Sequence, residues 1–164
     1  MKKIGIISDT HGYMDERIAH HLQYCDEIWH AGDIGDIAVT DELEKIAPVR
    51  AVYGNIDGGI LRTVFPLDHF FEVEGLKIFM THIAGKPGSY PARVSAEVRS
   101  LKPNVFICGH SHICMVKQNP AFGVLHINPG AAGVHGFHKV RTLLRMEVDK
   151  GKVTNLEVVE LGNR

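Results

Sequence analysis

Five predicted strands each end at polar residues that can bind a metal, and this pattern constrains the chain more than any other feature. These residues are Asp9 and His11, Gly32-Asp33, Gly54-Asn55, His82, and Gly109-His110 with His112. Because ligands of α/β sheets gather in the crevice at the carboxyl ends of the strands, we expect these side chains to converge there. Taken singly, each is typical of a turn or of a buried histidine. Together they predict one site.

The first of these segments follows the apolar run Ile4–Ile7, which has no alternation and is typical of a strand covered on both faces. Asp9 and His11 lie two positions apart, so in an extended backbone both side chains leave the same face, with Cα atoms about 6.6 Å apart. A cation could then bind both. The alternative is that Asp9 or Thr10, placed before Gly12, starts a helix as its N-cap.

The first third of the chain alternates between strand and helix patterns. Apolar residues recur every three or four positions from Met14 to Cys25, as on the buried face of a helix. Further strands are predicted at 27–32 and 49–53, with a helix at 41–46 between them. This alternation predicts a parallel sheet.

The rest of the chain adds antiparallel pairing. Two apolar segments, 70–73 and 77–80, flank a Glu-Gly-Leu turn as the strands of a hairpin do. The remaining patterns predict a helix with Val94, Val98 and Leu101 on one face and strands at 104–108, 114–117, 124–127, 141–148 and 153–160. We expect an α/β fold with mixed sheets and outer helices, formed by a single domain over residues 1–164.

Composition restricts the partners. The 164 residues are 45% hydrophobic and carry 18 basic and 19 acidic side chains. Since no basic run exceeds the Lys2-Lys3 pair, the broad basic face of a nucleic-acid-binding protein is not expected. The N-terminal apolar run is too short for a signal peptide, and no segment reaches membrane-spanning length, so no membrane partner is expected and the protein is predicted to be cytoplasmic.

The segment Cys108-x-His110-x-His112-x-Cys114 contains the donor types of a zinc site. In an extended chain these four residues span about 20 Å, whereas zinc needs all four donors about 2.0–2.3 Å from one ion. We therefore interpret both cysteines as packing residues. No functional role is assigned to His20, His21, His30, His69 and His126.

The ordered series Asp-x-His, Gly-Asp-x-x-Asp, Gly-Asn, His and Gly-His-x-His resembles the calcineurin-like metallophosphoesterase superfamily, in particular its small phosphodiesterase branch of the YfcE type. The resemblance implies a four-layer sandwich of two mixed sheets flanked by helices, with two divalent metal ions. One ion would be bound by Asp9, His11, Asp33 and His112, and the other by Asp33, Asn55, His82 and His110. Asp33, Asn55 and His82 would also be the catalytic residues.

These nitrogen and oxygen donors suit manganese, iron, nickel or zinc, of which manganese is the expected ion. Two such ions about 3.5–4 Å apart would activate a water molecule and clamp the phosphate oxygens of a small phosphorylated substrate. The same family branch also leaves a homodimer open as the oligomeric state.

One position departs from the family pattern. Fully equipped members carry a histidine after Gly-Asn that pairs with the second aspartate of Gly-Asp-x-x-Asp, and here that position is Ile56. Asp36 is thus interpreted either as an acceptor for a ligand histidine or as a loop residue. The loss favours phosphodiesters, or esters whose leaving group departs unaided. His135 and His138 could replace the missing acid, although solvated histidines of a Gly-rich surface loop are the simpler interpretation.

Three other functions stay open: a phosphomonoesterase, a nuclease, and a protein-binding scaffold of the retromer-subunit type with a degraded metal site. The overall charge argues against the nuclease. Because all seven expected metal-binding positions carry donor side chains, the enzyme is favoured over the scaffold.

Overall fold

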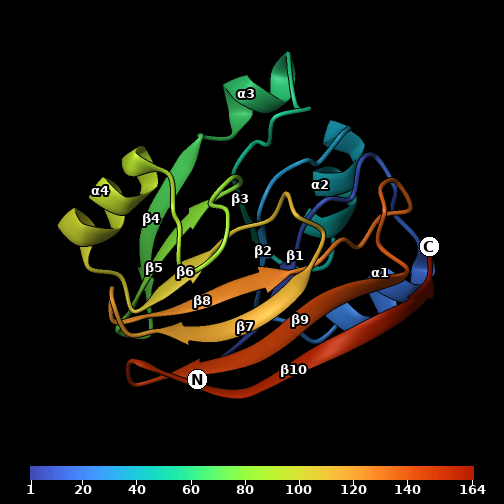
Figure 1. The fold of residues 1–164 in the computed structure, drawn as a ribbon. Coiled ribbons are helices and arrows are strands. Elements are labelled where there is room, and N and C mark those ends of the chain that lie inside the picture. The colour runs from blue at the N-terminus through green and yellow to red at the C-terminus, as the bar shows by residue number, and fades with distance from the viewer.

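Two five-stranded mixed sheets form the centre of the computed structural model, which describes residues 1–164 (Figure 1). The helices are α1 (Glu16–Leu22), α2 (Ile37–Glu44), α3 (Ile60–Val64) and α4 (Ala92–Leu101). The strands are β1 (Lys2–Ile7), β2 (Glu27–His30), β3 (Val49–Ala51), β4 (Asp68–Val73), β5 (Leu76–Thr81), β6 (Val105–Ile107), β7 (Cys114–Asn119), β8 (Val124–Pro129), β9 (Val140–Asp149) and β10 (Lys152–Asn163).

The first sheet has the strand order β10-β9-β1-β2-β3. Strands β1, β2 and β3 are parallel, with Ile6 opposite Trp29, as the alternation of strand and helix patterns predicts. Strands β9 and β10 form an antiparallel pair that extends the sheet beyond β1. The parallel part brings the carboxyl ends of β1 and β2 to the same edge.

The second sheet has the order β4-β5-β6-β8-β7. The predicted hairpin is present, with Val73 of β4 opposite Leu76 of β5. Strands β5, β6 and β8 run parallel to one another, and β7 pairs antiparallel with β8. The carboxyl ends of β5 and β6 therefore also lie together.

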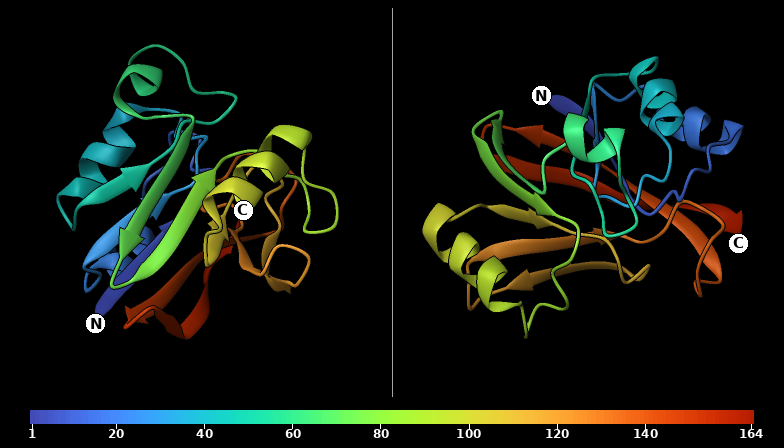
Figure 2. Two further views of the ribbon diagram at one scale, coloured as in Figure 1. Left: turned by 90° about the vertical axis from the view of Figure 1, so that its left-hand side faces the viewer. Right: turned by 90° about the horizontal axis from the view of Figure 1, so that it is seen from above.

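The sheets pack against each other through one apolar cluster, to which Ile6 and Trp29 contribute from the first sheet and Ile78 and Ile107 from the second. Helices α1 and α2 cover the outer face of the first sheet, and α4 covers the outer face of the second (Figure 2). The layers thus follow the order helix, sheet, sheet, helix. The predicted four-layer sandwich of mixed sheets is confirmed.

Three local predictions need correction. Helix α1 begins after Asp15, whose side chain accepts a hydrogen bond from the Ile18 amide, so neither Asp9 nor Thr10 is a helix cap. Helix α2 begins at Ile37 rather than at residue 41 because Asp36 caps it. The five-residue helix α3 is absent from the sequence prediction, since it is too short to show an apolar period.

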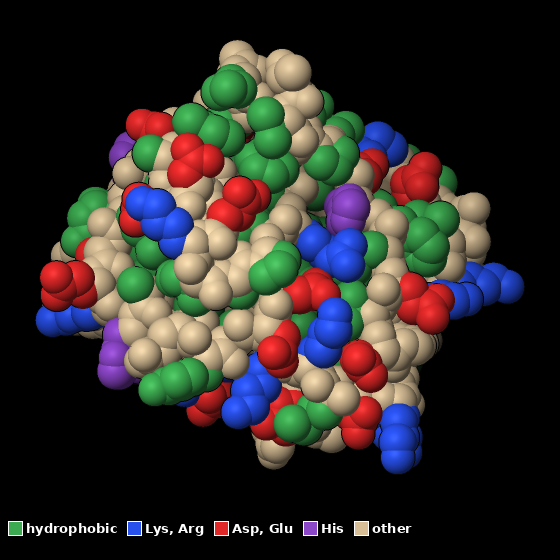
Figure 3. Space-filling model, turned by 180° about the vertical axis from the view of Figure 1, so that it is seen from behind, with side chains coloured by type: hydrophobic (Ala, Val, Ile, Leu, Met, Phe, Trp, Pro, Cys, Tyr) green, Lys and Arg blue, Asp and Glu red, His purple; other side chains and the backbone are tan.

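Seen from behind, the surface carries lysines and arginines interspersed with acidic side chains (Figure 3). This face has no extended field of one sign. No helix of the structure combines the length and the apolar character needed to cross a membrane.

Candidate metal centre

The predicted donors come from loops that follow four strands of the two sheets. Asp9 follows β1, Asp33 follows β2, His82 follows β5, and His110 and His112 follow β6. Each strand is buried up to its end, so the loop after it starts from a fixed point. The site therefore lies where the carboxyl edges of the two sheets come together.

The loop backbones differ from the extended geometry that the sequence spacing suggests. Asp9, His11, Asp33, His110 and His112 all have positive φ angles, between 46° and 71°. Non-glycine residues adopt this left-handed conformation at a cost, and residues strained in this way cluster at functional sites. The prediction of an extended Asp9-x-His11 segment is therefore wrong, although both side chains still reach one site.

The segment from Cys108 to Cys114 is also not extended, because His110 and His112 within it have positive φ angles. The two cysteines nevertheless lie in apolar surroundings. Cys108 is fully buried in the cluster beneath α4, with Sγ 3.6 Å from Nε2 of His126, and Cys114 packs against the core between the sheets. Burial raises the pKa of the Cys108 thiol to about 12. Both cysteines serve as packing residues here.

One group of donors consists of Asp9, His11 and His112, whose ligand atoms all lie within 4.8 Å of one another. The Oδ2 atom of Asp9 accepts hydrogen bonds from Ser8 Oγ at 2.6 Å and from the His110 amide at 3.1 Å. The other oxygen, Oδ1, faces His112 Nε2 at 3.1 Å and His11 Nε2 at 3.8 Å. One carboxylate oxygen thus fixes the side chain and the other points into the site.

A second group consists of Asp33, His82 and His110, again with ligand atoms within 4.8 Å. Asp33 Oδ1 accepts a hydrogen bond from the Ile56 amide at 3.1 Å, while Oδ2 lies 3.2 Å from His82 Nε2. His82 Nδ1 donates to the Ala31 carbonyl at 2.7 Å. Since a carbonyl only accepts, His82 carries a proton on Nδ1, and in the neutral ring the lone pair lies on Nε2, toward the site.

The two groups are adjacent, because His11 Nε2 lies 3.4 Å from Asp33 Oδ2 and His82 Nε2 lies 3.9 Å from Asp9 Oδ1. Three of these atoms, Asp9 Oδ1, His11 Nε2 and His82 Nε2, are buried without a hydrogen-bond partner. Buried polar atoms in native proteins are nearly always paired. Unpaired oxygen and nitrogen lone pairs that face one another fit divalent cations of the type expected from the sequence.

Electrostatics favours ionised carboxylates in the site. Burial alone would raise the pKa of Asp9, but the rings of His11 and His112 that face it outweigh this effect and hold that pKa below its usual range. The pKa of Asp33 is also lowered, since His82 opposes the effect of burial. The pKa of His11 is raised, chiefly by Asp9. Both carboxylates are therefore ionised at neutral pH.

Two glycines allow this close packing. A Cβ atom at Gly54 would overlap Asp33 Oδ1, and one at Gly109 would overlap Ser8 Oγ and lie 2.7 Å from Asp9 Oδ2. Glycine is therefore required beside each carboxylate.

Asn55, the remaining predicted donor, is exposed on the loop after β3. It lines one cavity with His82 and a second with His11 and Asp33. Six of the seven predicted donors thus form the two groups, and Asn55 borders the same cavities as His82, His11 and Asp33 from an exposed position. Ile56, next to it, is 49% exposed and lines the second of these cavities.

Asp36 and Asp57 differ from what the sequence pattern suggests. Asp36 accepts from the Ala38 amide as the N-cap of α2, which is the loop interpretation of this residue. Asp57 is buried and accepts hydrogen bonds from three backbone amides, those of Ile34, Gly35 and Gly54. It therefore ties the Asp33 loop to the Asn55 loop. This role of Asp57 could not be predicted from the sequence, because the residue lies within an ordinary turn pattern.

His135 and His138 both lie beside the donors. His135 is exposed, as expected of a solvated loop residue, whereas His138 is half-buried against His112. The ring of His135 lies 4.7 Å from that of His11, and His138 Nδ1 lies 3.3 Å from His112 Nδ1. Both line a cavity of about 540 Å³ that is also lined by His11 and His112 of the first group and by Asp33 and His110 of the second. Burial lowers the pKa of His138.

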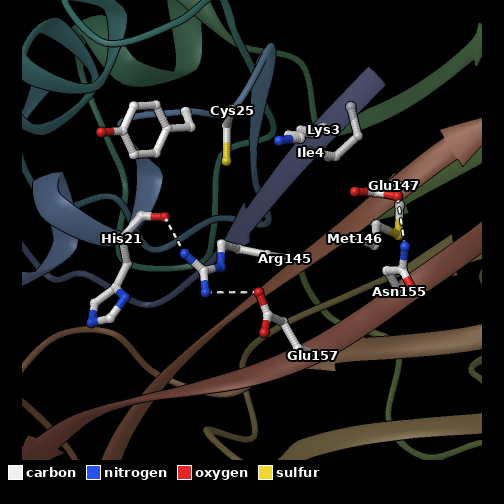
Figure 4. A pocket seen from close by; sticks show the side chains of 10 residues that line it. Lys3, Ile4, His21, Cys25, Arg145, Met146, Glu147, Asn155 and Glu157 are labelled. Atoms are coloured by element: carbon white, nitrogen blue, oxygen red, sulfur yellow. Dashed lines mark hydrogen bonds and ion pairs between the residues drawn. The ribbon is translucent and has the colours of Figure 1, made fainter. Parts of the chain in front are cut away.

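A separate cavity of about 340 Å³ lies beside the amino-terminal half of β1 and is bordered by β9 and β10 (Figure 4). None of the predicted donors lines it. Arg145 is held there by the His21 carbonyl at 3.1 Å and by Glu157 at 2.7 Å. The guanidinium of Arg145 is therefore already bound within the protein. The metal-type donors all lie at the other end of β1.

The chain is similar in sequence to known proteins. Residues 1–151 match the family model of the calcineurin-like phosphoesterase superfamily domain. A probable metallophosphoesterase of Methanothermobacter thermautotrophicus is 30% identical over 137 residues, covering 80% of this chain and 77% of that protein. A phosphodiesterase of Methanocaldococcus jannaschii is 31% identical over 144 residues, covering 78% of this chain and 82% of that protein.

The solved structure of Vps29 from Chaetomium thermophilum is similar in fold. It superposes with a TM-score of 0.77 over the whole of both chains, at 19% identity. At this identity the likeness concerns the fold alone.

Proposed function

The chain belongs to the calcineurin-like phosphoesterase superfamily, and on this premise we propose that it is a phosphodiesterase that hydrolyses a small phosphate ester with two bound divalent metal ions. The observation that carries the proposal is the pair of adjacent donor groups with three buried, unpartnered ligand atoms. Leaving buried polar atoms unpaired is costly, so their presence favours a site that binds metal ions.

The seven predicted side chains would hold the ions as the family pattern implies, with Asp33 shared between them and manganese as the proposed metal. When bound, two such ions supply positive charge for the phosphoryl oxygens and lower the pKa of a water molecule. One oxygen of Asp33, Oδ2, lies close to Nε2 of both His82 and His11. Asp33 would therefore be shared between the two ions. Asn55, in its exposed position, is placed to contact the phosphate.

The attacking group in this proposal is water, and no nucleophilic side chain is involved. The hydrogen bond from His82 Nδ1 to the Ala31 carbonyl holds the ring with Nε2 toward the site. In this proposal His82 therefore binds a metal ion and does not transfer its Nδ1 proton. Positioning and electrostatic stabilisation thus supply most of the catalysis.

The cavity over the donors suggests the substrate class. It is lined by no lysine or arginine, and its rim carries three exposed apolar side chains, Ile56, Ile113 and Phe137. A second phosphate group would find no cationic side chain in this cavity. In the adjoining cavity, Arg62 and Arg93 are already bound to the Asp57 carbonyl and to the Asp68 side chain. We therefore propose an ester with a single phosphate and an apolar or aromatic organic group. Because Ile56 cannot donate a proton, diesters with a good leaving group are favoured over alkyl monoesters.

The test is hydrolysis of matched mono- and diesters of nitrophenol and of an alkyl alcohol by the manganese-loaded protein and two variants. Asp33→Asn removes the charge of the shared donor, and we expect it to lower diester hydrolysis at least about 100-fold. Asp36→Asn is the matched control, since asparagine caps a helix as well as aspartate does, and it should keep full activity.

The outcomes separate the candidate functions. Faster hydrolysis of monoesters than of diesters would assign a phosphomonoesterase. Metal binding without hydrolysis of any ester would favour the protein-binding scaffold. Full activity of Asp33→Asn would place the hydrolysis outside this site.

A further inference from the structure

We propose that His138 is a positioning residue that sets the tautomer and ring orientation of His112, and thereby the metal affinity of the site. The inference rests on the proposed metal centre. It adds to that centre a side chain outside the family pattern, in the loop after β8.

The first step concerns the proton of His138. Its Nε2 lies 2.8 Å from the carbonyl oxygen of Gly133. A carbonyl accepts and cannot donate, so Nε2 of His138 carries the hydrogen. In the neutral ring the lone pair is then on Nδ1.

The second step concerns the proton of His112, which the lone pair of His138 determines. The two Nδ1 atoms are 3.3 Å apart, and the Nδ1 of His138 can only accept. His112 must therefore donate from Nδ1, which leaves its Nε2 free as the ligand atom. This atom lies 3.1 Å from Asp9 Oδ1, on the side of the other donors. The Gly133 carbonyl thus fixes, through His138, which nitrogen of His112 can bind a metal.

The loop is shaped to hold this pair. The rings of His112 and His138 meet edge to face, with centroids 5.1 Å apart and an interplanar angle of 75°. Gly136, with φ of +129°, lies against them, and a Cβ atom there would overlap His112 Nδ1. Solvated histidines of a flexible loop would need no such glycine.

His82 offers an internal comparison. Its Nδ1 donates to a backbone carbonyl, that of Ala31, and its Nε2 points into the site. His112 has the same arrangement, except that the acceptor is a side chain. Partners of this kind orient metal-ligating histidines, and their loss costs about 10- to 100-fold in metal affinity.

Two isosteric variants separate positioning of His112 from simple support of the loop. His138→Asn places Oδ1 where Nδ1 was and keeps the acceptor for His112, but loses the group that donates to Gly133. His138→Gln places its amide nitrogen where Nε2 was and keeps that donor, but loses the acceptor. Zinc affinity of the metal-free protein would be measured by calorimetry, with thermal unfolding in EDTA as the check of folding. In the zinc-loaded protein, nitrogen-15 NMR would locate the protons on the His112 ring.

We expect His138→Asn to bind zinc within a few-fold of the unmodified chain and His138→Gln to bind about 10- to 100-fold more weakly. The slowly exchanging Nδ1 proton of His112 should persist in the first variant and be lost in the second. The reverse order, or equal affinity in both variants, would overturn the role of His138. Failure of the unmodified chain to bind zinc would instead overturn the metal centre, and with it the proposed function.

Discussion

At the scale of single residues, each donor side chain uses one atom for hydrogen bonds to the protein and leaves another atom facing the site. Asp9 uses Oδ2 for Ser8 and the His110 amide, and Asp33 uses Oδ1 for the Ile56 amide. The remaining oxygens face the histidines. His82 likewise donates a hydrogen bond from one ring nitrogen, Nδ1, to a backbone carbonyl. Each donor is thus held by hydrogen bonds that leave one ligand atom free, so the site is organised before any ion binds.

His30 shows the opposite use of a buried histidine, and it gives a prediction on pH. Its Nδ1 accepts from the Gly32 amide at 3.1 Å and its Nε2 lies 3.0 Å from Thr10 Oγ1, which itself donates to the Ile34 carbonyl. Complete burial lowers the pKa of His30 from 6.5 to about 4. The neutral ring therefore supports the loop that begins at Gly32.

The sign of the pH effect follows from this lowered pKa. Above pH 6.5 both the folded and unfolded states hold a neutral His30, and its contribution to stability is complete. Below that, the unfolded chain takes up a proton that the folded chain refuses until about pH 4, so stability falls by about 3 kcal/mol across this window. In His30→Asn this loss is absent. We expect the stability advantage of the unmodified chain over the variant to shrink by this amount between pH 7 and pH 4, in urea unfolding with EDTA. Parallel stability curves would contradict the prediction.

At the scale of elements, the sequence predicts strands better than the loops between them. Buried runs such as Ile4–Ile7 predict strands because they are too short for a helix and end at polar residues. Short connections predict the pairing of neighbours such as β4 with β5. They do not predict the pairing of β1 with β9 or of β6 with β8. Loop conformation does not follow in this way: the left-handed backbone at Asp9 and His112 depends on contacts from other loops, which no local pattern encodes. For the same reason the approach of His138 to His112 could not be foreseen.

Asp57 carries the prediction that belongs to this scale. Its carboxylate accepts from the amides of Ile34, Gly35 and Gly54 at 2.8–3.0 Å, in a buried position. Asp57→Ala leaves these three donors unpaired, so we expect the free energy of unfolding to fall by about 3 kcal/mol or more. Asp57→Asn keeps one acceptor oxygen and should lose less.

Urea unfolding of the metal-free protein measures this loss, with Asp41→Ala as the control because Asp41 is an exposed residue of α2. A second expected result is weaker zinc binding in Asp57→Ala, since the loops that carry Asp33 and Asn55 lose their common anchor. Unfolding energies equal to that of the control would show that the two loops are held by other contacts.

At the scale of the whole molecule, the donors join the two sheets. Asp9, His11 and Asp33 follow strands of the first sheet, whereas His82, His110 and His112 follow strands of the second. The apolar core between the sheets already holds these edges together. We propose on this basis that residues 1–164 unfold as one cooperative domain, and that metal binding adds to the stability of both sheets at once.

Thermal unfolding tests this proposal. An ion that binds only the folded chain stabilises it by about 2.7 kcal/mol at a free concentration of 100 times Kd. For a chain of this size that corresponds to a rise in Tm of about 5–10 °C. We expect one transition whose midpoint rises with manganese or zinc by this amount in the unmodified chain and much less in Asp33→Asn. Because each ion would draw ligands from both sheets, circular dichroism and tryptophan fluorescence of Trp29, buried between them, should report the same midpoint. Two separate midpoints would mean that the sheets unfold independently, and a metal-insensitive midpoint would mean that the donor groups do not bind these ions.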